Sequence, residues 1–229
     1  MPIEIGRIQA LCFDVDGTLS DTDDLWAARI ARWLAPARNL LPDRDPPKAA
    51  RRIVMGIDTP SNFIYAVADR LWLDDIAMRA VAAIHRRRPS RRRKECHALL
   101  IPGVTEMLAQ LNGRLPMAVV SARDEHGTSA FLDKFELGGF FQVVASGQTC
   151  ARTKPHPQPV LWAAEQMRVS PEACLMIGDT TVDIRAGRAA GAQTLGILSG
   201  FGDEGELQRA GADGILPSVA DLPGFLLAE

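Results

Sequence analysis

Short apolar runs recur along the chain, and polar residues follow each of them directly. The clearest runs cover residues 8–13, 116–120, 173–177 and 194–198, with helical stretches between them. Short apolar runs bounded by turn residues are typical of buried strands. Strands that alternate with helices favour right-handed crossovers and a parallel sheet. The pattern therefore predicts an α/β fold with a doubly wound, Rossmann-like parallel sheet.

Polar side chains stand where three of these predicted strands end. Asp14 and Asp16 follow the first, Ser121 the second and Asp179 the third. If the backbone stays extended, Asp14 and Asp16 project to the same side of the sheet. Two such charges repel by about 4 kcal/mol at ~4 Å and an effective dielectric of ~20, so we expect a cation beside them. Open parallel sheets bind ligands at this edge. The residues expected there are Asp14, Asp16, Ser121, Lys154, Asp179 and Asp183.

Four segments, taken in order, resemble the four motifs of the haloacid dehalogenase superfamily, most closely its phosphoglycolate-phosphatase-like members. They are residues 14–18, residues 121–123, Lys154 with its neighbouring prolines, and residues 178–183. The resemblance covers nearly the whole chain outside residues 20–96. The dehalogenating members of the family lack the second aspartate, so Asp16 favours phosphate over halide substrates.

Phosphoryl transfer needs a nucleophile, in-line positioning and neutralisation of charge. Asp14 is the candidate nucleophile, which would form an aspartyl-phosphate. Asp16 is the candidate general acid and base for the leaving oxygen and the attacking water. Lys154 offers a compact cation to the phosphoryl group. The other candidates for binding phosphate or substrate are Gly17, Thr18, Ser121, Ala122 and Arg123.

The second motif carries one departure from the family pattern. Ser121 would donate its hydroxyl to the phosphate, and Ala122 its backbone N–H. Arg123 follows them where many relatives have asparagine or another small polar residue. We expect its guanidinium to reach the phosphate or the leaving group of the substrate.

The charge of the predicted cleft calls for a metal ion. Four acidic side chains converge on a dianionic substrate, and Lys154 alone offsets them. Carboxylate and carbonyl oxygens select a hard cation, and Mg²⁺ is the usual one beside phosphates. The family resemblance implies the Asp14 side chain, the Asp16 main-chain carbonyl and the Asp179 side chain as direct ligands. Asp183 is expected in a second layer, acting through water or by orienting Lys154. Asp179 could at the same time cap the helix that follows it.

Residues 20–96 follow a helical rather than a strand-like period, and prolines separate the periodic segments. We therefore predict an all-helical cap domain of residues 20–96, inserted after the first strand. The haloacid dehalogenase-like hydrolase core would comprise residues 1–19 and 97–229. Hinges beside the active-site loop would let the cap exclude water and select the leaving group.

Two other patterns suggest different partners. Residues 86–94 include seven basic side chains, but no aromatic residue interleaves with them. They indicate a cationic helix end rather than a nucleic-acid surface, and some could instead steer anionic substrates. Residues 200–205 match G-x-G-x-x-G, but an acidic pair would meet the pyrophosphate of a dinucleotide. We expect a glycine-rich turn that ends the fifth core strand. His156, between two prolines, is expected to shape its loop rather than act as a base.

Composition adds limits on location and partners. The net charge of −2 gives no reason to expect a nucleic-acid or membrane partner. The four cysteines, at 12, 96, 150 and 174, form no CxxC pair and are expected to be reduced. The N-terminus lacks the pattern of a signal peptide, and no apolar run approaches a membrane span. We expect a cytoplasmic monomer or dimer.

These patterns together predict a phosphoric monoester hydrolase that depends on Mg²⁺ and acts on a small phosphorylated metabolite through Asp14. A pyrophosphatase or nucleotidase on the same core remains open. A phosphonate-cleaving enzyme would need a cap lysine, and the context of Lys48 does not favour one. A non-catalytic regulatory binding protein could share the fold, but such a protein need not keep all four motifs.

Overall fold

The computed structural model describes residues 2–21, 32–40, 46, 49 and 98–227. The chain divides into two compact units, one of Met1–Asp21 with Cys96–Glu229 and the other of Thr22–Glu95. All predicted site residues lie in the first unit. In the second, the structure describes the 3₁₀ helix η2 (Ala35–Leu40). Residues 20–21, 32–34, 46 and 49 of the predicted helical cap are also described, and the remainder, including the basic run of residues 86–94, lies outside the described residues.

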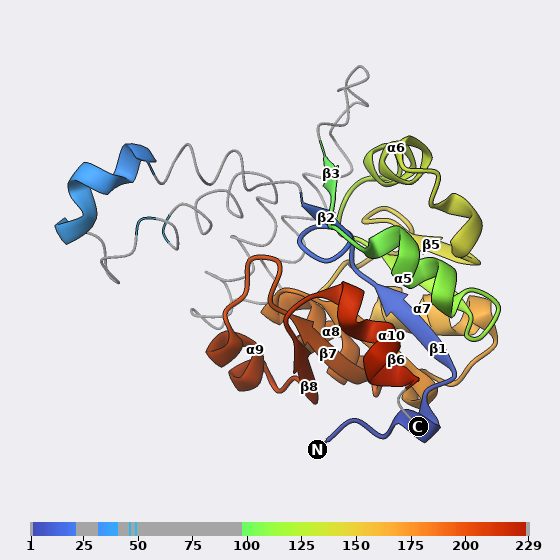
Figure 1. Cartoon of the computed structure of the whole chain (residues 1–229). Coiled ribbons are helices and arrows are strands. Elements are labelled where there is room, and N and C mark those ends of the chain that lie inside the picture. The colour runs from blue at the N-terminus through green and yellow to red at the C-terminus, as the bar shows by residue number, and fades with distance from the viewer. Residues whose placement is uncertain (1, 22–31, 41–45, 47–48, 50–97, 228–229) are drawn as a thin grey trace. The chain divides into compact units, whose positions relative to one another are not determined.

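The first unit is built on a six-stranded sheet with the order β5-β4-β1-β6-β7-β8, and each neighbouring pair is parallel. The strands are β1 (Ala10–Phe13), β4 (Met117–Val120), β5 (Val143–Ala145), β6 (Cys174–Gly178), β7 (Gln193–Ile197) and β8 (Gly214–Leu216). The chain winds from β1 out to β5, returns to β6 and continues to β8 (Figure 1). The predicted doubly wound α/β fold is thereby confirmed, and its switch point lies beside β1.

Helices cover both faces of the sheet. They are α5 (Val104–Leu111), α6 (Glu125–Lys134), α7 (Gln158–Met167), α8 (Thr181–Ala190), α9 (Glu204–Ala210) and α10 (Leu222–Leu226). Successive side chains of β1 point to opposite faces. Leu11 and Phe13 belong to one core cluster with residues of α5, α6 and α10, whereas Ala10 and Cys12 belong to another with residues of α7 and α8. Because helices cover both faces, the central strands β1, β4 and β6 are buried and carry no polar side chain.

Among its described residues, the first unit also has four 3₁₀ helices, of which the first precedes β1 and the others lie between helices and strands. They are η1 (Ile5–Arg7), η3 (Gly138–Phe140), η4 (Pro171–Ala173) and η5 (Val219–Asp221). Helix α8 is the helix that the sequence predicts after Asp179. Gly187 lets α8 approach the sheet closely, because a Cβ there would lie 2.7 Å from side-chain atoms of both Met176 and Thr194. This close packing holds α8 directly against β6 and β7.

A second, two-stranded sheet stands where the chain leaves and re-enters the first unit. Strand β2 (Ser20–Asp21) pairs antiparallel with β3 (Leu99–Leu100). The Ile101 N–H also donates to the Leu19 carbonyl at 3.1 Å. In Figure 1 the β1 arrow points toward this pair. Both connections to the second unit are therefore held side by side, directly after the turn that follows β1.

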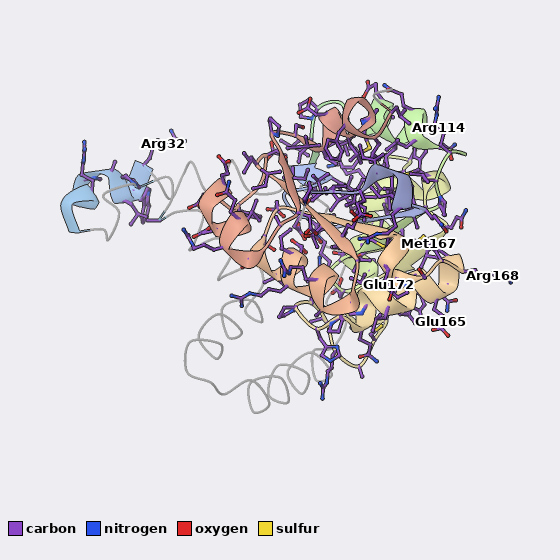
Figure 2. The ribbon with its side chains drawn as sticks, turned by 90° about the horizontal axis from the view of Figure 1, so that it is seen from below. Arg32, Arg114, Glu165, Met167, Arg168 and Glu172 are labelled. Atoms are coloured by element: carbon purple, nitrogen blue, oxygen red, sulfur yellow. The ribbon has the colours of Figure 1, made fainter. Side chains whose placement is uncertain are left out.

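Charged side chains are exposed at one edge of the main sheet and buried at the other. At the edge where the chain enters the strands, Arg114 precedes β4, and Arg168 and Glu172 precede β6; all three are exposed. Figure 2 shows Arg168 pointing away from the ribbon, at the end of α7. At the opposite edge, several charged groups are buried, which costs free energy unless they are paired or functional. The edge at the carboxyl ends of the strands therefore has the buried charges that a functional site requires.

Among the described residues, Cys12, Cys150 and Cys174 form no disulfide. None of the helices described is both long and apolar enough to cross a bilayer.

Candidate active site

Three adjacent strands, β4, β1 and β6, end side by side and bring the predicted residues together. In register, Phe13 pairs with both Val119 and Ile177. Asp14 is therefore level with the last residues of β4 and β6, and Ser121 and Asp179 follow one position further along. These side chains are buried, and their residues are 6%, 1% and 0% exposed.

The turn after β1 directs the chain sharply into β2. Its Val15 carbonyl accepts N–H bonds from the three residues 18–20, at 2.8–3.3 Å. Gly17 has φ +79°, a left-handed conformation that glycine adopts without strain. A Cβ at Gly17 would also lie 2.1 Å from Asp179 Oδ2. Thr18 is buried, and its hydroxyl donates to Asp179 Oδ1 at 3.4 Å. Gly17 and Thr18, predicted to bind phosphate, thus lie directly against Asp179.

Lys154 supplies the buried cation of the site. Its Nζ donates to Asp14 Oδ1 at 2.7 Å and to Asp183 Oδ1 at 2.6 Å, and the residue is 2% exposed. Burial by itself lowers the pKa of Lys154, but the carboxylates of Asp14 and Asp183 outweigh burial and raise that pKa above its ordinary value. The ammonium group therefore stays charged at neutral pH.

Lys154 does not compensate all of the acidic charge around it. The pKa of Asp14 is raised to about 7: burial is the largest cause, Lys154 lowers the pKa, and Asp183 and Asp16 raise it again. Burial, reinforced by Asp183 and Asp14, also raises the pKa of Asp179 well above its ordinary value. One lysine thus faces three buried carboxylates, and the site has too little positive charge to keep all of them ionised.

Asp183 connects Lys154 to the first turn of α8. Its Oδ2 accepts hydrogen bonds from the Thr180 N–H at 3.1 Å and the Thr180 hydroxyl at 2.6 Å, while its Oδ1 accepts from Lys154. Thr180 is the N-cap residue of α8. The expectation that Asp179 caps this helix is therefore wrong, because the chain is still leaving β6 at Asp179. If Asp183 orients Lys154, as the sequence predicts, the two side chains must be in contact, and they are.

The three buried carboxylates could hold a metal ion. Asp14, Asp179 and Asp183 each offer an oxygen, and these oxygens lie within 4.8 Å of one another. A set of carboxylate oxygens suits a hard divalent cation such as Mg²⁺. The shortage of positive charge is a second reason for a cation at this position. The residues present therefore fit the ion that the sequence predicts.

Asp16 is half-buried and is held by Arg123 rather than by Lys154. The Arg123 Nε donates to Asp16 Oδ2 at 2.7 Å, and its terminal nitrogen donates to Asp16 Oδ1, so the contact is bidentate. The guanidinium also lies 5.6 Å from the centre of the Phe131 ring. The sequence predicts Arg123 at the substrate but gives no sign of this ion pair, because the two residues lie 107 positions apart.

Ser121 stands directly after β4, which is the neighbour of β1 in the sheet. Its Oγ accepts the Arg123 backbone N–H at 3.1 Å. That bond does not use the hydroxyl proton of Ser121, which can be donated to a ligand. Ala122, whose N–H is the predicted partner of that hydroxyl, is half-buried beside it.

The loop after β7 forms one side of the site, which sequence reasoning did not foresee. The Phe201 N–H donates to Asp179 Oδ2 at 2.7 Å, and the Gly202 N–H to the Asp179 carbonyl at 3.0 Å. The Ser199 hydroxyl donates to the Gly17 carbonyl at 3.4 Å. The expected turn is present at residues 198–199, with bends at Gly200 and Phe201, but Gly205 already belongs to helix α9. The available signal was the position of this loop directly after a core strand, at the ligand-binding edge.

His156 lies in the Lys154 loop and contacts other residues of that loop. Its Nδ1 accepts the Gln158 N–H at 3.2 Å, and its Nε2 lies 3.1 Å from an Arg152 nitrogen. Burial, and then the charge of Arg152, lower the pKa of His156. These contacts are those of a residue that shapes its loop, as the sequence predicts.

Comparison with known proteins agrees with this geometry. Residues 11–197 match the family model described as haloacid dehalogenase-like hydrolase. The phosphoglycolate phosphatase of Escherichia coli (strain K12) is 27% identical over 238 residues, covering 94% of this chain and 91% of that protein. The phosphoglycolate phosphatase of Nitrosospira multiformis is 29% identical, covering 93% and 92%. A hydrolase of the same family from Deinococcus radiodurans, crystallised with phosphate and sodium, shares the fold with a TM-score of 0.67 and 23% identity, covering 97% and 96%.

Proposed function

The chain belongs to the haloacid dehalogenase-like hydrolase family, and from that premise we propose that it is a Mg²⁺-dependent phosphatase that hydrolyses a small phosphate monoester. The observation that carries the proposal is the buried group of Asp14, Lys154, Asp183 and Asp179 at the switch point of the sheet. Relatives named as phosphatases along nearly their whole length support the same class of enzyme.

Asp14 is the proposed nucleophile. Its carboxylate stands at the end of β1, and Lys154 binds its Oδ1. Attack by a carboxylate oxygen forms a bond to phosphorus while the bond from phosphorus to the leaving oxygen breaks, giving an aspartyl-phosphate. Water then attacks the same phosphorus, the bond to Asp14 breaks, and inorganic phosphate is released.

Asp16 is the proposed general acid and base. In the first step it would give its proton to the leaving oxygen, and in the second it would take a proton from the attacking water. It stands two residues after the nucleophile and is less buried than Asp14, so solvent and substrate can both reach it. Arg123 is well placed to orient it, because the bidentate contact fixes both carboxylate oxygens.

The phosphoryl group would be bound by Lys154, the Ser121 hydroxyl and the Ala122 N–H. Ser121 retains its hydroxyl proton for this purpose, and Lys154 supplies the charge. Gly17 and Thr18 would act on the phosphate indirectly. They form the turn after β1, and the Thr18 hydroxyl donates a hydrogen bond to Asp179. These contacts position the phosphorus atom for in-line attack, which is most of what phosphoryl transfer asks of a protein.

The proposed ligands of the ion are the side chains of Asp14 and Asp179 and the main-chain carbonyl of Asp16. Asp183 would contribute by fixing Lys154. When bound, Mg²⁺ supplies positive charge that offsets both the buried carboxylates and the phosphoryl oxygens.

The proposed substrate is a small phosphorylated metabolite, and phosphoglycolate is the first to test because the curated relatives are named for it. We also propose a cytoplasmic location, in keeping with the unpaired cysteines among the described residues. A cap formed by residues 20–96 would select the leaving group.

The decisive test is hydrolysis of p-nitrophenyl phosphate with Mg²⁺, repeated with EDTA and with Asp14→Asn. Activity should disappear in both cases. Asp133→Asn, a change of the same kind at an exposed position on α6, is the matched control and should keep full activity. Hydrolysis that survives in Asp14→Asn would rule out the assigned nucleophile.

A panel of phosphorylated metabolites then separates the remaining readings. Preference for a small monoester supports the proposal, and preference for pyrophosphate or nucleotides favours the pyrophosphatase or nucleotidase alternative. Tight binding of phosphate compounds with no turnover of any of them would indicate a regulatory binding protein. A crystal structure with Mg²⁺ and beryllofluoride should show the fluoride adduct on Asp14.

A further inference from the structure

The G-x-G-x-x-G segment of residues 200–205 has the sequence of a dinucleotide loop but a different structure. Asp203 is the N-cap of α9, and its Oδ1 accepts the Glu206 N–H at 2.8 Å. An acidic cap already occupies the helix end that would have to receive a pyrophosphate. The glycines therefore need another explanation, and the contacts of residues 199–202 provide one.

These residues bind Asp179 and the turn beside it through backbone groups. The Phe201 N–H donates to Asp179 Oδ2 at 2.7 Å, and the Gly202 N–H to the Asp179 carbonyl at 3.0 Å. One short segment thus holds both the side chain and the main chain of the same fully buried aspartate. Hydrogen bonds of this kind, from outside the ligand set, commonly orient a metal-binding carboxylate.

The approach is so close that only glycine fits. A Cβ on Gly200 would lie 2.0 Å from Asp179 Oδ2 and 2.4 Å from its Cγ. A Cβ on Gly17, from the turn after β1, would lie 2.1 Å from the same Oδ2. This oxygen is therefore enclosed by two glycines and bound by one N–H. The other oxygen, Oδ1, has a longer contact of 3.4 Å, from the Thr18 hydroxyl.

We propose that residues 199–202 position Asp179 for metal binding by fixing its Oδ2, so that Oδ1 is the oxygen presented to the ion. The inference rests on the metal site of the proposed function and adds a residue-level requirement to it. Gly200 is required because of the space that Asp179 occupies. Phe201 acts through its backbone N–H, so its side chain is not part of the requirement.

The first test is the affinity for Mg²⁺, measured by isothermal titration calorimetry without substrate. Gly200→Ala should raise the Kd for Mg²⁺ by about 10–100-fold, the usual effect of losing a group that orients a metal ligand. Gly205→Ala is the matched control, since it alters the same motif but its Cβ would meet only Arg209 and Asp203 side-chain atoms, at 3.3 Å or more. It should change the Kd by less than about twofold. An unchanged Kd in Gly200→Ala would overturn the inference.

A second measurement needs no substitution and applies even if Gly200→Ala fails to fold. In the wild-type chain, hydrogen exchange at the Phe201 amide should slow by about tenfold or more when Mg²⁺ saturates the site, because the ion holds Asp179 in place. The Gly205 amide serves as the internal reference and should change little. Equal exchange at Phe201 with and without Mg²⁺ would overturn the proposed positioning role.

The two proposals fail in different ways. If the wild-type chain binds no Mg²⁺, the metal dependence of the proposed function is wrong, and this inference falls with it. If the wild-type chain binds Mg²⁺ and hydrolyses phosphate esters but neither Gly200→Ala nor the Phe201 amide responds, only the role of residues 199–202 is wrong.

Discussion

Replacing Lys154 with methionine tests how far the active site depends on one buried cation. The side chain makes hydrogen bonds to Asp14 and Asp183 at 2.7 and 2.6 Å and is almost fully buried. Methionine has a similar length but no charge, so the substitution leaves the two carboxylates without their shared partner. The change isolates the electrostatic contribution from the contribution of packing.

The expected loss of stability follows from burial. Removing one partner of a buried ion pair costs about 3–5 kcal/mol, because the remaining charge stays desolvated. For a domain of this size each kcal/mol lowers Tm by about 2–4 °C, so Tm should fall by about 6–20 °C in EDTA. Protonation of Asp14 limits this loss, since burial already raises its pKa to about 7.

The pH dependence has a definite sign. A carboxyl group whose pKa is raised in the folded state binds more protons there than in the unfolded chain, so stability falls as pH rises between the two pKa values. Metal-free Lys154→Met should therefore lose more stability at pH 8 than at pH 5.5, relative to wild type. Differential scanning calorimetry in EDTA at the two pH values measures both effects.

Lys134→Met is the matched control, because Lys134 is exposed and its ammonium donates to the Ala98 carbonyl at 2.8 Å. We expect it to lower Tm by only a few degrees, at about 1 kcal/mol for one hydrogen bond. If Lys154→Met melts within a degree or two of wild type at pH 8, the buried carboxylates do not depend on this cation. The electrostatic account of the site would then be wrong.

Three further predictions concern other residues of the site. Asp179→Asn should raise Tm in EDTA, because it removes a buried charge whose pKa burial has raised, and it should abolish the stabilisation by Mg²⁺; a lower Tm in EDTA would contradict this. Arg123→Ala should lower kcat more than it changes KM. The loss in kcat should be larger for alkyl than for aryl phosphates, since only poor leaving groups need the proton from Asp16. Arg123→Lys should recover part of the loss, and equal losses on both substrates would refute a role through Asp16. The ring signals of His156 should titrate below about 6.5 in NMR spectra, because burial lowers its pKa, and its contribution to stability should grow as pH rises, since the unfolded chain binds that proton more readily; a pKa above 6.5 would contradict the contacts described.

The central strands could be predicted from sequence because their signal is local. Strands β1, β4, β6 and β7 lie within two residues of the predicted runs, and Asp14 and Asp179 follow directly from where β1 and β6 end. The edge strands β5 and β8 were not predicted. Each has three residues, which is too short for a distinctive apolar pattern.

The contacts between loops could not be predicted in the same way. The bond from Phe201 to Asp179 and the pairing of Arg123 with Asp16 depend on which strands are neighbours and on the path of each loop above them. No periodicity in the sequence encodes such a path. The wrong prediction for the N-cap of α8 had a smaller cause. Asp179 and Thr180 are both good N-cap residues, and β6 ends at Gly178, one residue beyond the predicted run, so the helix starts later and Thr180 takes the cap position.

The antiparallel pair β2–β3 has a consequence for engineering, because it is a point at which the inserted segment can be exchanged. Asp21 and Leu99 are directly paired across it, and antiparallel partners can be joined by a tight turn of two residues such as Asn-Gly. Residues 22–98 could thus be excised and the ends joined at that point, with the backbone entering and leaving the catalytic scaffold unchanged. Such a junction can accept inserted domains of different size, so the same catalytic core can be combined with different domains that select the substrate.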